Sequence, residues 1–313
     1  MKKTYLAGLL ACFLLLSACG AGANQADAPR LRVAATTWPV YCFASAVAEG
    51  AEGVEIIPVV NQSMSCLHDY TLTVTDMKAL DRADLILENG VGLEEFMSDA
   101  LEASNTPVVD CSRGVALCHT DEDDPDHDHE SEEEHHDHGH DHGEYDPHIW
   151  LDPLRAAGMA DNIAAALSQA DPGQSALYEA NASAARQTLA ALAEEGKAKL
   201  SGLSSRDLIT FHDGFGYFAE AFDLHILKAI EEEEGSETSA REFRELTALI
   251  REKDVPAVFT EINGSDATAR ALRRETGVTI GVLSTAMSGE GSGLGPYLDA
   301  MKANIDTIVE ALA

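Results

Sequence analysis

Short apolar runs alternate with helix-forming segments along most of this 313-residue chain, and this alternation restricts the folds available to it. The runs that predict strands lie at residues 31–36, 54–60, 84–90, 107–111, 207–211, 224–230, 256–262 and 278–283. The segments that predict helices lie at residues 39–50, 73–83, 93–104, 153–169, 214–222, 239–253, 266–276 and 297–312. Strands that alternate with helices favour parallel sheets covered by helices. The predicted fold class is therefore α/β.

One long Ala-rich segment at 172–203 divides this alternation into two halves. Its apolar side is formed by Leu177, Ala184, Leu189, Leu192 and Leu200. A helix of about 30 residues spans roughly 45 Å, which is long for a single lobe. We therefore predict two α/β lobes with parallel sheets, at residues 31–170 and 204–313, joined by one long rigid helix at 171–203. A cleft is expected between the lobes.

The N-terminus has the features of an export signal. Lys2 and Lys3 precede the apolar run TYLAGLLACFLLL, which is too short for a comfortable membrane span. The sequence LSACG follows, and its Cys19 stands where bacterial lipoproteins carry lipid. We predict a signal peptide at 1–18, lipidation of Cys19, a flexible tether at 19–30 and a folded part outside the cytoplasm, lipid-anchored to the cell membrane. The alternative is an ordinary secretory signal in which Cys19 is incidental.

Four further cysteines would then lie in a compartment that permits disulfides. Cys111 with Cys118 would close a short loop, and Cys42 with Cys66 would join two early loops. The sequence leaves this pairing open. Cys66 also lies close to His68, so a thiolate metal ligand is the alternative for that residue.

Three histidines lie at the ends of predicted elements, two after strands and one before a helix. His68 follows the strand at 54–60, His212 follows the strand at 207–211 at once, and His148 stands just before a helix start at Asp152. Ligands of open α/β sheets bind beyond the carboxyl ends of the strands. Three imidazoles from separate segments commonly hold zinc, with a fourth position for a carboxylate or water, and imidazole suits zinc better than manganese. We predict a zinc site of His68, His148 and His212 in the interlobe cleft.

The neighbours of these histidines fit the same prediction. A ligating imidazole needs an acceptor for its second nitrogen, and Asp69, Asp146 and Asp213 are adjacent in sequence. His225 begins an apolar run and is predicted to be structural.

The segment at 119–144 interrupts the alternation and contains the run HDHESEEEHHDHGHDH. It has no apolar period, so a disordered loop is predicted. Its accessory metal-binding candidates are His127, His129, His135, His136, His138, His140 and His142. Because ordering such a loop costs entropy, we expect weak binding of several zinc ions there and tighter binding of one ion in the cleft. A purely solubilising loop is the alternative.

The formal net charge of -33 argues against a nucleic-acid partner.

The mature chain resembles the zinc branch of the metal-binding solute-binding lipoproteins of bacterial metal ABC transporters, the zinc uptake periplasmic binding proteins. The segments that carry the resemblance are LSAC, CLHDYTLTVTDMKAL, YDPHIWLDP, FHDGFGYFAEAF and PAVFTEINGSDATARALRRETGV. It implies two lobes with the metal between them and His68, His148 and His212 as ligands. It also implies delivery of the metal to a membrane permease without catalysis. A histidine rather than a glutamate at position 212, and the His-rich loop itself, resemble the zinc members.

The resemblance leaves the fourth ligand open. Many members place Asp or Glu after the last strand, where this chain has Ser284 and Thr285. Glu261, water or a loop histidine are the candidates, and a role as hydrogen-bond acceptor for a ligand is the alternative for Glu261.

The predicted function is therefore capture of zinc by a monomer and its delivery to the permease. The alternatives are manganese as the ion, a metal buffer or adhesin without a transport role, and a zinc-dependent hydrolase. The hydrolase has the least support, because the chain contains neither H-E-x-x-H nor G-x-S-x-G.

Overall fold

The computed structural model describes residues 30–60, 70–119, 145–230 and 238–313. Several sequence predictions fall outside these residues. They concern the signal peptide, Cys19 and its tether, His68 with Cys66 and Asp69, and the seven accessory histidines of the loop.

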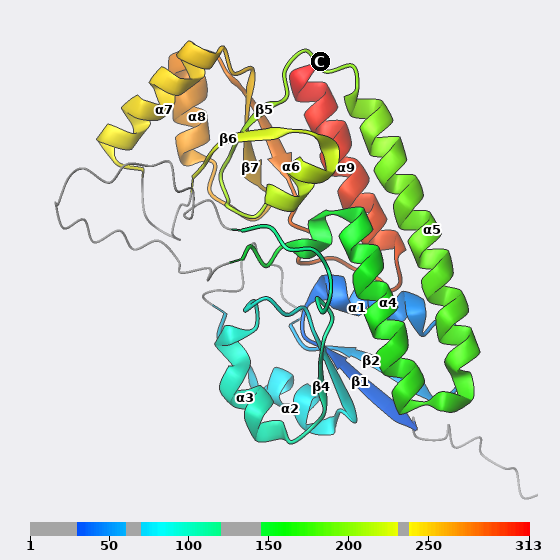
Figure 1. Cartoon of the computed structure of the whole chain (residues 1–313). Coiled ribbons are helices and arrows are strands. Elements are labelled where there is room, and N and C mark those ends of the chain that lie inside the picture. The colour runs from blue at the N-terminus through cyan, green and yellow to red at the C-terminus, as the bar shows by residue number, and fades with distance from the viewer. Residues whose placement is uncertain (1–29, 61–69, 120–144, 231–237) are drawn as a thin grey trace, which may run out of the picture.

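Two parallel sheets of four strands each form the centres of two lobes (Figure 1). The first sheet has the order β2-β1-β3-β4 and consists of β1 (Leu31–Ala35), β2 (Val54–Pro58), β3 (Leu85–Glu88) and β4 (Val108–Asp110). The second has the order β6-β5-β7-β8 and consists of β5 (Asp207–Thr210), β6 (His225–Ala229), β7 (Ala257–Glu261) and β8 (Thr279–Leu283). The lobes thus share one strand order, and the predicted α/β fold with two parallel sheets is confirmed.

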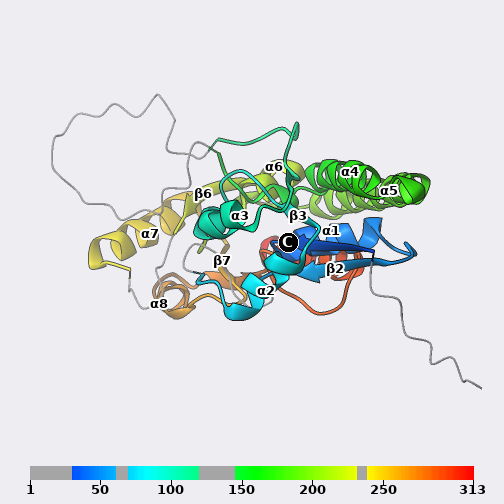
Figure 2. The same cartoon turned by 90° about the horizontal axis from the view of Figure 1, so that it is seen from below.

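Helices surround both sheets. The first lobe contains α1 (Trp38–Val47), α2 (Val74–Arg82), the 3-10 turn η1 (Glu95–Met97) and α3 (Ser98–Ser104). The second contains α6 (Gly216–Phe222), α7 (Ala240–Lys253) and α8 (Ala267–Thr276). Three longer helices, α4 (Pro153–Ala170), α5 (Ser175–Leu200) and α9 (Gly295–Leu312), lie along the side that joins the lobes (Figures 1 and 2). Two 3-10 turns, η3 (Ile149–Leu151) and η4 (Pro172–Gln174), precede α4 and α5.

The start of α4 shows how local sequence fixes an element near the site. The carboxylate of Asp152 caps the helix by accepting hydrogen bonds from the backbone N–H groups of Leu154 at 2.7 Å and Arg155 at 3.4 Å. Pro153 occupies the first helical position, where the missing N–H costs nothing. The predicted Asp-Pro helix start therefore holds α4 directly behind the DPHIW segment.

The long helix α5, which links the lobes, is packed against other helices. α5 packs against α1, α4 and α9, so it is covered along its inner side (Figure 1). One large hydrophobic cluster extends from Leu31 in the first strand through Trp150 and Phe218 to Leu312 in the last helix, and a smaller one lies in the second lobe. The lobes are therefore joined by shared apolar packing as well as by chain connectivity.

The cysteines differ from the sequence prediction. Cys42, Cys111 and Cys118 are free thiols. Cys111 is fully buried, whereas the Cys118 thiol donates a hydrogen bond to Oε2 of Glu220 at 2.9 Å. The disulfide between Cys111 and Cys118 that the sequence permits is therefore not formed, and the two thiols lie in different surroundings. Burial raises the pKa of the Cys42 thiol to about 12, and this thiol is also unpaired.

Ordered backbone continues through His119, which the sequence assigned to the loop. His119 forms an isolated antiparallel bridge with Tyr145, and their ring centroids lie 4.6 Å apart. The backbone N–H of Asp146 donates to the carbonyl of Cys118 at 3.1 Å. The described residues on the two sides of the loop, which end at His119 and resume at Tyr145, therefore lie side by side.

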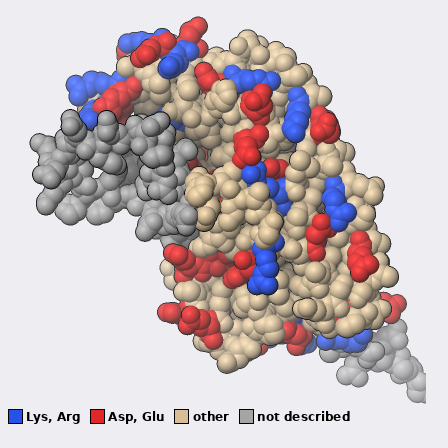
Figure 3. Space-filling model, in the orientation of Figure 1, with Lys and Arg blue, Asp and Glu red and all other residues tan. Residues whose placement is uncertain are grey.

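Charged side chains of both signs are interspersed over the face seen in Figure 3. On α7 and α8, for example, Arg241 pairs with Glu245, and Arg251 pairs with Glu275 at 2.7 Å. Within the described residues, no helix is both long and apolar enough to cross a bilayer.

Candidate metal centre

Two of the predicted ligands meet where the lobes face each other. His212 lies two residues after the end of β5, and His148 lies immediately before η3 and α4. Their Nε2 atoms are 3.2 Å apart, and their ring planes are nearly perpendicular, at 87°. Both side chains are buried, with exposures of 3% for His148 and 8% for His212. Residues distant in sequence thus present two imidazole nitrogens to one point.

The spacing of these nitrogens suits a shared metal ion. Two nitrogens that each lie about 2.0–2.1 Å from a tetrahedral zinc ion are separated by about 3.3 Å. The observed separation of 3.2 Å agrees with that value. The donor set therefore fits zinc geometrically as well as chemically.

Asp146 orients His148. Its Oδ1 lies 2.7 Å from Nδ1 of His148 and also accepts a hydrogen bond from the His148 backbone N–H at 2.8 Å. A proton on Nδ1, donated to the carboxylate, leaves Nε2 with its lone pair directed toward His212. The structure thus places Asp146 in the acceptor position expected from the sequence, while Asp213 lies half-buried beside His212.

Gly214 lies against the two imidazoles, where a larger residue would crowd them. A Cβ atom at Gly214 would lie 2.6 Å from Nε2 of His212 and 2.9 Å from Nε2 of His148. Both separations are shorter than normal carbon–nitrogen contacts. Gly214, the first glycine of FHDGFGYF, therefore leaves room for the two imidazoles, a role that the sequence prediction missed.

Glu261 is the buried carboxyl group associated with this centre. It is the last residue of β7, and its Oε1 accepts a hydrogen bond of 2.7 Å from the hydroxyl of Thr285. Burial raises the pKa of Glu261 to about 7, whereas the hydrogen bond from Thr285 and the charge of His148 lower it. Thr285, which follows β8, thus holds the acidic side chain at the end of β7.

A second buried carboxylate supports the same region from the first lobe. Glu94 accepts hydrogen bonds from the hydroxyl of Thr36 at 2.7 Å and from the backbone N–H groups of Asn89 and Gly90. The Asn89 side chain donates to the carbonyl of Pro147 at 3.0 Å, next to His148. Burial raises the pKa of Glu94 to about 7, although these hydrogen bonds lower it. The ends of β1 and β3 are thereby connected to the ligand segment, a role for Glu94 that the helical pattern did not indicate.

The other two histidines discussed in the sequence analysis, His225 and His68, do not contribute to the site that the structure describes. His225 is exposed at the start of β6, with Nδ1 3.4 Å from Oδ1 of Asp207, as expected for a residue outside the site. In the part of the chain that the structure describes, no group of three or more His, Cys, Asp or Glu side chains could hold a metal ion. The predicted third ligand, His68, lies outside that part.

Comparison with known families gives the classification of the chain. The sequence profile described as "ZnuA: Zinc-uptake complex component A periplasmic" matches residues 33–311. This chain belongs to that family. Its members are metal-binding substrate-binding proteins of ABC transporters rather than enzymes. The ZnuA-family assignment and the absence of catalysis are therefore confirmed, and the hydrolase alternative is wrong.

Individual relatives of the ZnuA family match the chain over most of its length. The high-affinity zinc uptake system protein ZnuA of Bacillus subtilis is 29% identical over 97% of this chain and 96% of its own length. The periplasmic zinc-binding protein TroA of Treponema pallidum is 27% identical in sequence, with a TM-score of 0.74 over 90% of this chain and 99% of that structure. The solute-binding protein FpvC of Pseudomonas aeruginosa, solved with Mn²⁺, is 25% identical with a TM-score of 0.74 over 90% of this chain and 98% of that structure.

Proposed function

We propose that this protein captures one zinc ion between its lobes and delivers it to the permease of a metal ABC transporter. The observation that carries this proposal is the pair of buried Nε2 atoms of His148 and His212, 3.2 Å apart. His68 is proposed as the third ligand, from its place after the second strand and from the resemblance of its segment to the family pattern.

Zinc is proposed over manganese because of the donor set. Imidazole nitrogens suit zinc, whereas manganese favours sites with more oxygen ligands. Relatives include a zinc-binding protein from Treponema pallidum and a manganese-binding lipoprotein from Halalkalibacterium halodurans, so family membership alone does not decide the ion. The two described histidines are what favours zinc here.

Glu261 is the proposed acidic neighbour of the ion, either as the fourth ligand or as a hydrogen-bond acceptor for a ligand. The hydroxyl of Thr285 donates a hydrogen bond to Oε1 of Glu261, and the charge of His148 lowers the pKa of Glu261. Water, or a histidine of the loop, is the alternative for the fourth position.

The proposed location is outside the cytoplasm, with Cys19 carrying a lipid anchor and the protein acting as a monomer. The signal sequence carries this proposal. Relatives described as metal-binding lipoproteins, such as AdcA of Streptococcus pneumoniae, support it.

Replacing residues 119–144 with a short Gly-Ser linker should lower the zinc stoichiometry to one without weakening the tight site. The backbone contact between Cys118 and Asp146 shows that a short linker can close the gap. We expect this result because the loop histidines are proposed to bind additional ions weakly, whereas the cleft ligands belong to the folded lobes. Isothermal titration of the mature protein with and without the loop measures both quantities.

Two results of this titration would contradict the proposal. An unchanged stoichiometry would remove the metal-gathering role of the loop. Loss of the tight site with the loop would show that the transported ion binds in the loop and not between the lobes.

A further inference from the structure

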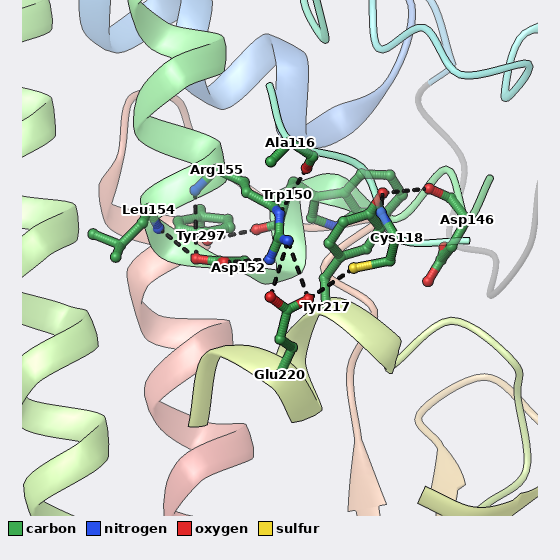
Figure 4. A network of polar contacts seen from close by, with 10 residues as sticks. All are labelled: Ala116, Cys118, Asp146, Trp150, Asp152, Leu154, Arg155, Tyr217, Glu220 and Tyr297. Carbon is green, nitrogen blue, oxygen red and sulfur yellow. Dashed lines mark hydrogen bonds and ion pairs between the residues drawn. The ribbon is translucent and has the colours of Figure 1, made fainter. Parts of the chain in front are cut away.

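The backbone of the ligand segment is held by a side chain from the other lobe. Tyr217 lies on α6, five residues after His212, and is fully buried. Its hydroxyl donates a hydrogen bond to the carbonyl of Asp146 at 2.8 Å and accepts one from the backbone N–H of Cys118 at 3.0 Å (Figure 4). One hydroxyl thus joins the two chain segments at the base of the loop, at the residue that orients His148.

Arg155 in turn fixes the position of Tyr217. Its guanidinium carbon lies 4.7 Å from the centroid of the Tyr217 ring, which is a cation–π contact. Its nitrogens also donate to the carbonyl of Ala116 at 2.8 Å, to Oδ2 of Asp152 at 2.7 Å and to Oε2 of Glu220 at 3.0 Å (Figure 4). Arg155 therefore connects the loop base, the start of α4 and α6.

The turn after His148 is held in the same way. The hydroxyl of Tyr297 on α9 donates to the carbonyl of Trp150 at 2.7 Å, and the Trp150 indole N–H donates to the carbonyl of Thr285 at 2.7 Å. The backbone is thus fixed by hydrogen bonds on both sides of His148. Buried polar groups that are fully paired specify one local arrangement, because each unmade bond is costly.

We propose that Tyr217 and Arg155 are positioning residues that lock the His148 segment to α6, so that His148 and His212 form a preorganised pair before metal binds. This inference rests on the proposed function, in which the pair binds the ion. Tyr217 and Arg155 contact the backbone and α6, and they act on the ion through the position of His148. Loss of partners that orient a metal ligand typically weakens metal affinity by about 10–100-fold.

The direct test is Tyr217→Phe in the full mature chain, which removes the hydroxyl and keeps the ring beneath Arg155. We expect about tenfold weaker zinc binding at the tight site, measured by competition with a chelator. We also expect a change in the visible absorption of bound Co²⁺, which reports ligand geometry and not stability.

Tyr178→Phe is the matched control. Tyr178 is equally buried in α5, and its hydroxyl contacts Asp171 and Gln174. It should retain wild-type affinity and spectrum.

Glu220→Gln provides a second variant with little effect on folding, because the Glu220 side chain is 59% exposed. Weakening its pairing with Arg155 should change the Co²⁺ spectrum in the same direction as Tyr217→Phe, with a smaller loss of affinity.

Two outcomes would overturn the inference. Wild-type affinity and Co²⁺ spectrum in Tyr217→Phe would show that the hydroxyl does not position the site, and equal losses in Tyr178→Phe would show a general effect of destabilisation. His148→Ala separates this failure from failure of the proposed function. Tight zinc binding that survives His148→Ala contradicts the function itself, whereas binding lost in His148→Ala but unchanged in Tyr217→Phe contradicts only the positioning role.

Discussion

His148→Ala is expected to weaken zinc binding at the tight site by more than about 100-fold, which corresponds to about 2.7 kcal/mol of binding free energy. The substitution removes one of the two facing Nε2 atoms and leaves Oδ1 of Asp146 without its imidazole partner. Loss of an outer partner costs 10–100-fold, so loss of the ligand itself should exceed that range. Competition between the mature protein and a chelator of known zinc affinity measures the effect.

His225→Ala is the matched control for this prediction, since His225 is exposed on β6 and pairs only loosely with Asp207 at 3.4 Å. It should bind zinc like the wild type. A loss of less than about threefold in His148→Ala, or an equal loss in both variants, would contradict the assignment of His148 as a ligand.

Gly214→Ala should also weaken tight zinc binding strongly, by a purely steric mechanism. The added Cβ would lie 2.6 Å from Nε2 of His212 and 2.9 Å from Nε2 of His148, so the imidazoles must shift from their present positions. A ligand displaced by even a fraction of an ångström no longer meets the tetrahedral geometry of zinc. We expect a loss of about 100-fold in affinity, measured by the same competition, while the thermal midpoint of the metal-free protein falls by only a few degrees.

Gly202→Ala provides the control for this substitution. A Cβ at Gly202 would meet nothing within 4 Å, so this change should leave both zinc affinity and the fold intact. If Gly214→Ala bound zinc as tightly as Gly202→Ala, the ion could not occupy the point where the two imidazoles meet.

The sequence was sufficient to predict the fold because local signals agree with the global arrangement. The alternation of strands and helices indicated two parallel sheets, and Asp152 followed by Pro153 marked the start of α4. His212 could be predicted at the site because it follows a strand of a parallel sheet, where ligands bind, and His148 because it stands just before a helix start. These inferences need only patterns that lie within short stretches of sequence.

The remaining features depend on contacts between residues far apart in the sequence, both between the lobes and within one lobe, and no local pattern indicates them. The hydroxyl of Tyr217 reaches the carbonyl of Asp146 across 71 residues of sequence, and Thr285 reaches Glu261 across 24. The state of the cysteines could not be predicted for a similar reason. An even number permits disulfides, but the position of each thiol in the fold decides the pairing, and Cys118 instead donates to Glu220.

Anomalous X-ray diffraction at the zinc edge from crystals of the zinc-loaded mature protein tests the central claim most directly. We predict one strong peak between the lobes, about 2.0–2.1 Å from Nε2 of both His148 and His212. An ordered zinc peak elsewhere, with the space between these two nitrogens empty, would contradict the assignment of the interlobe cleft as the site of the transported ion.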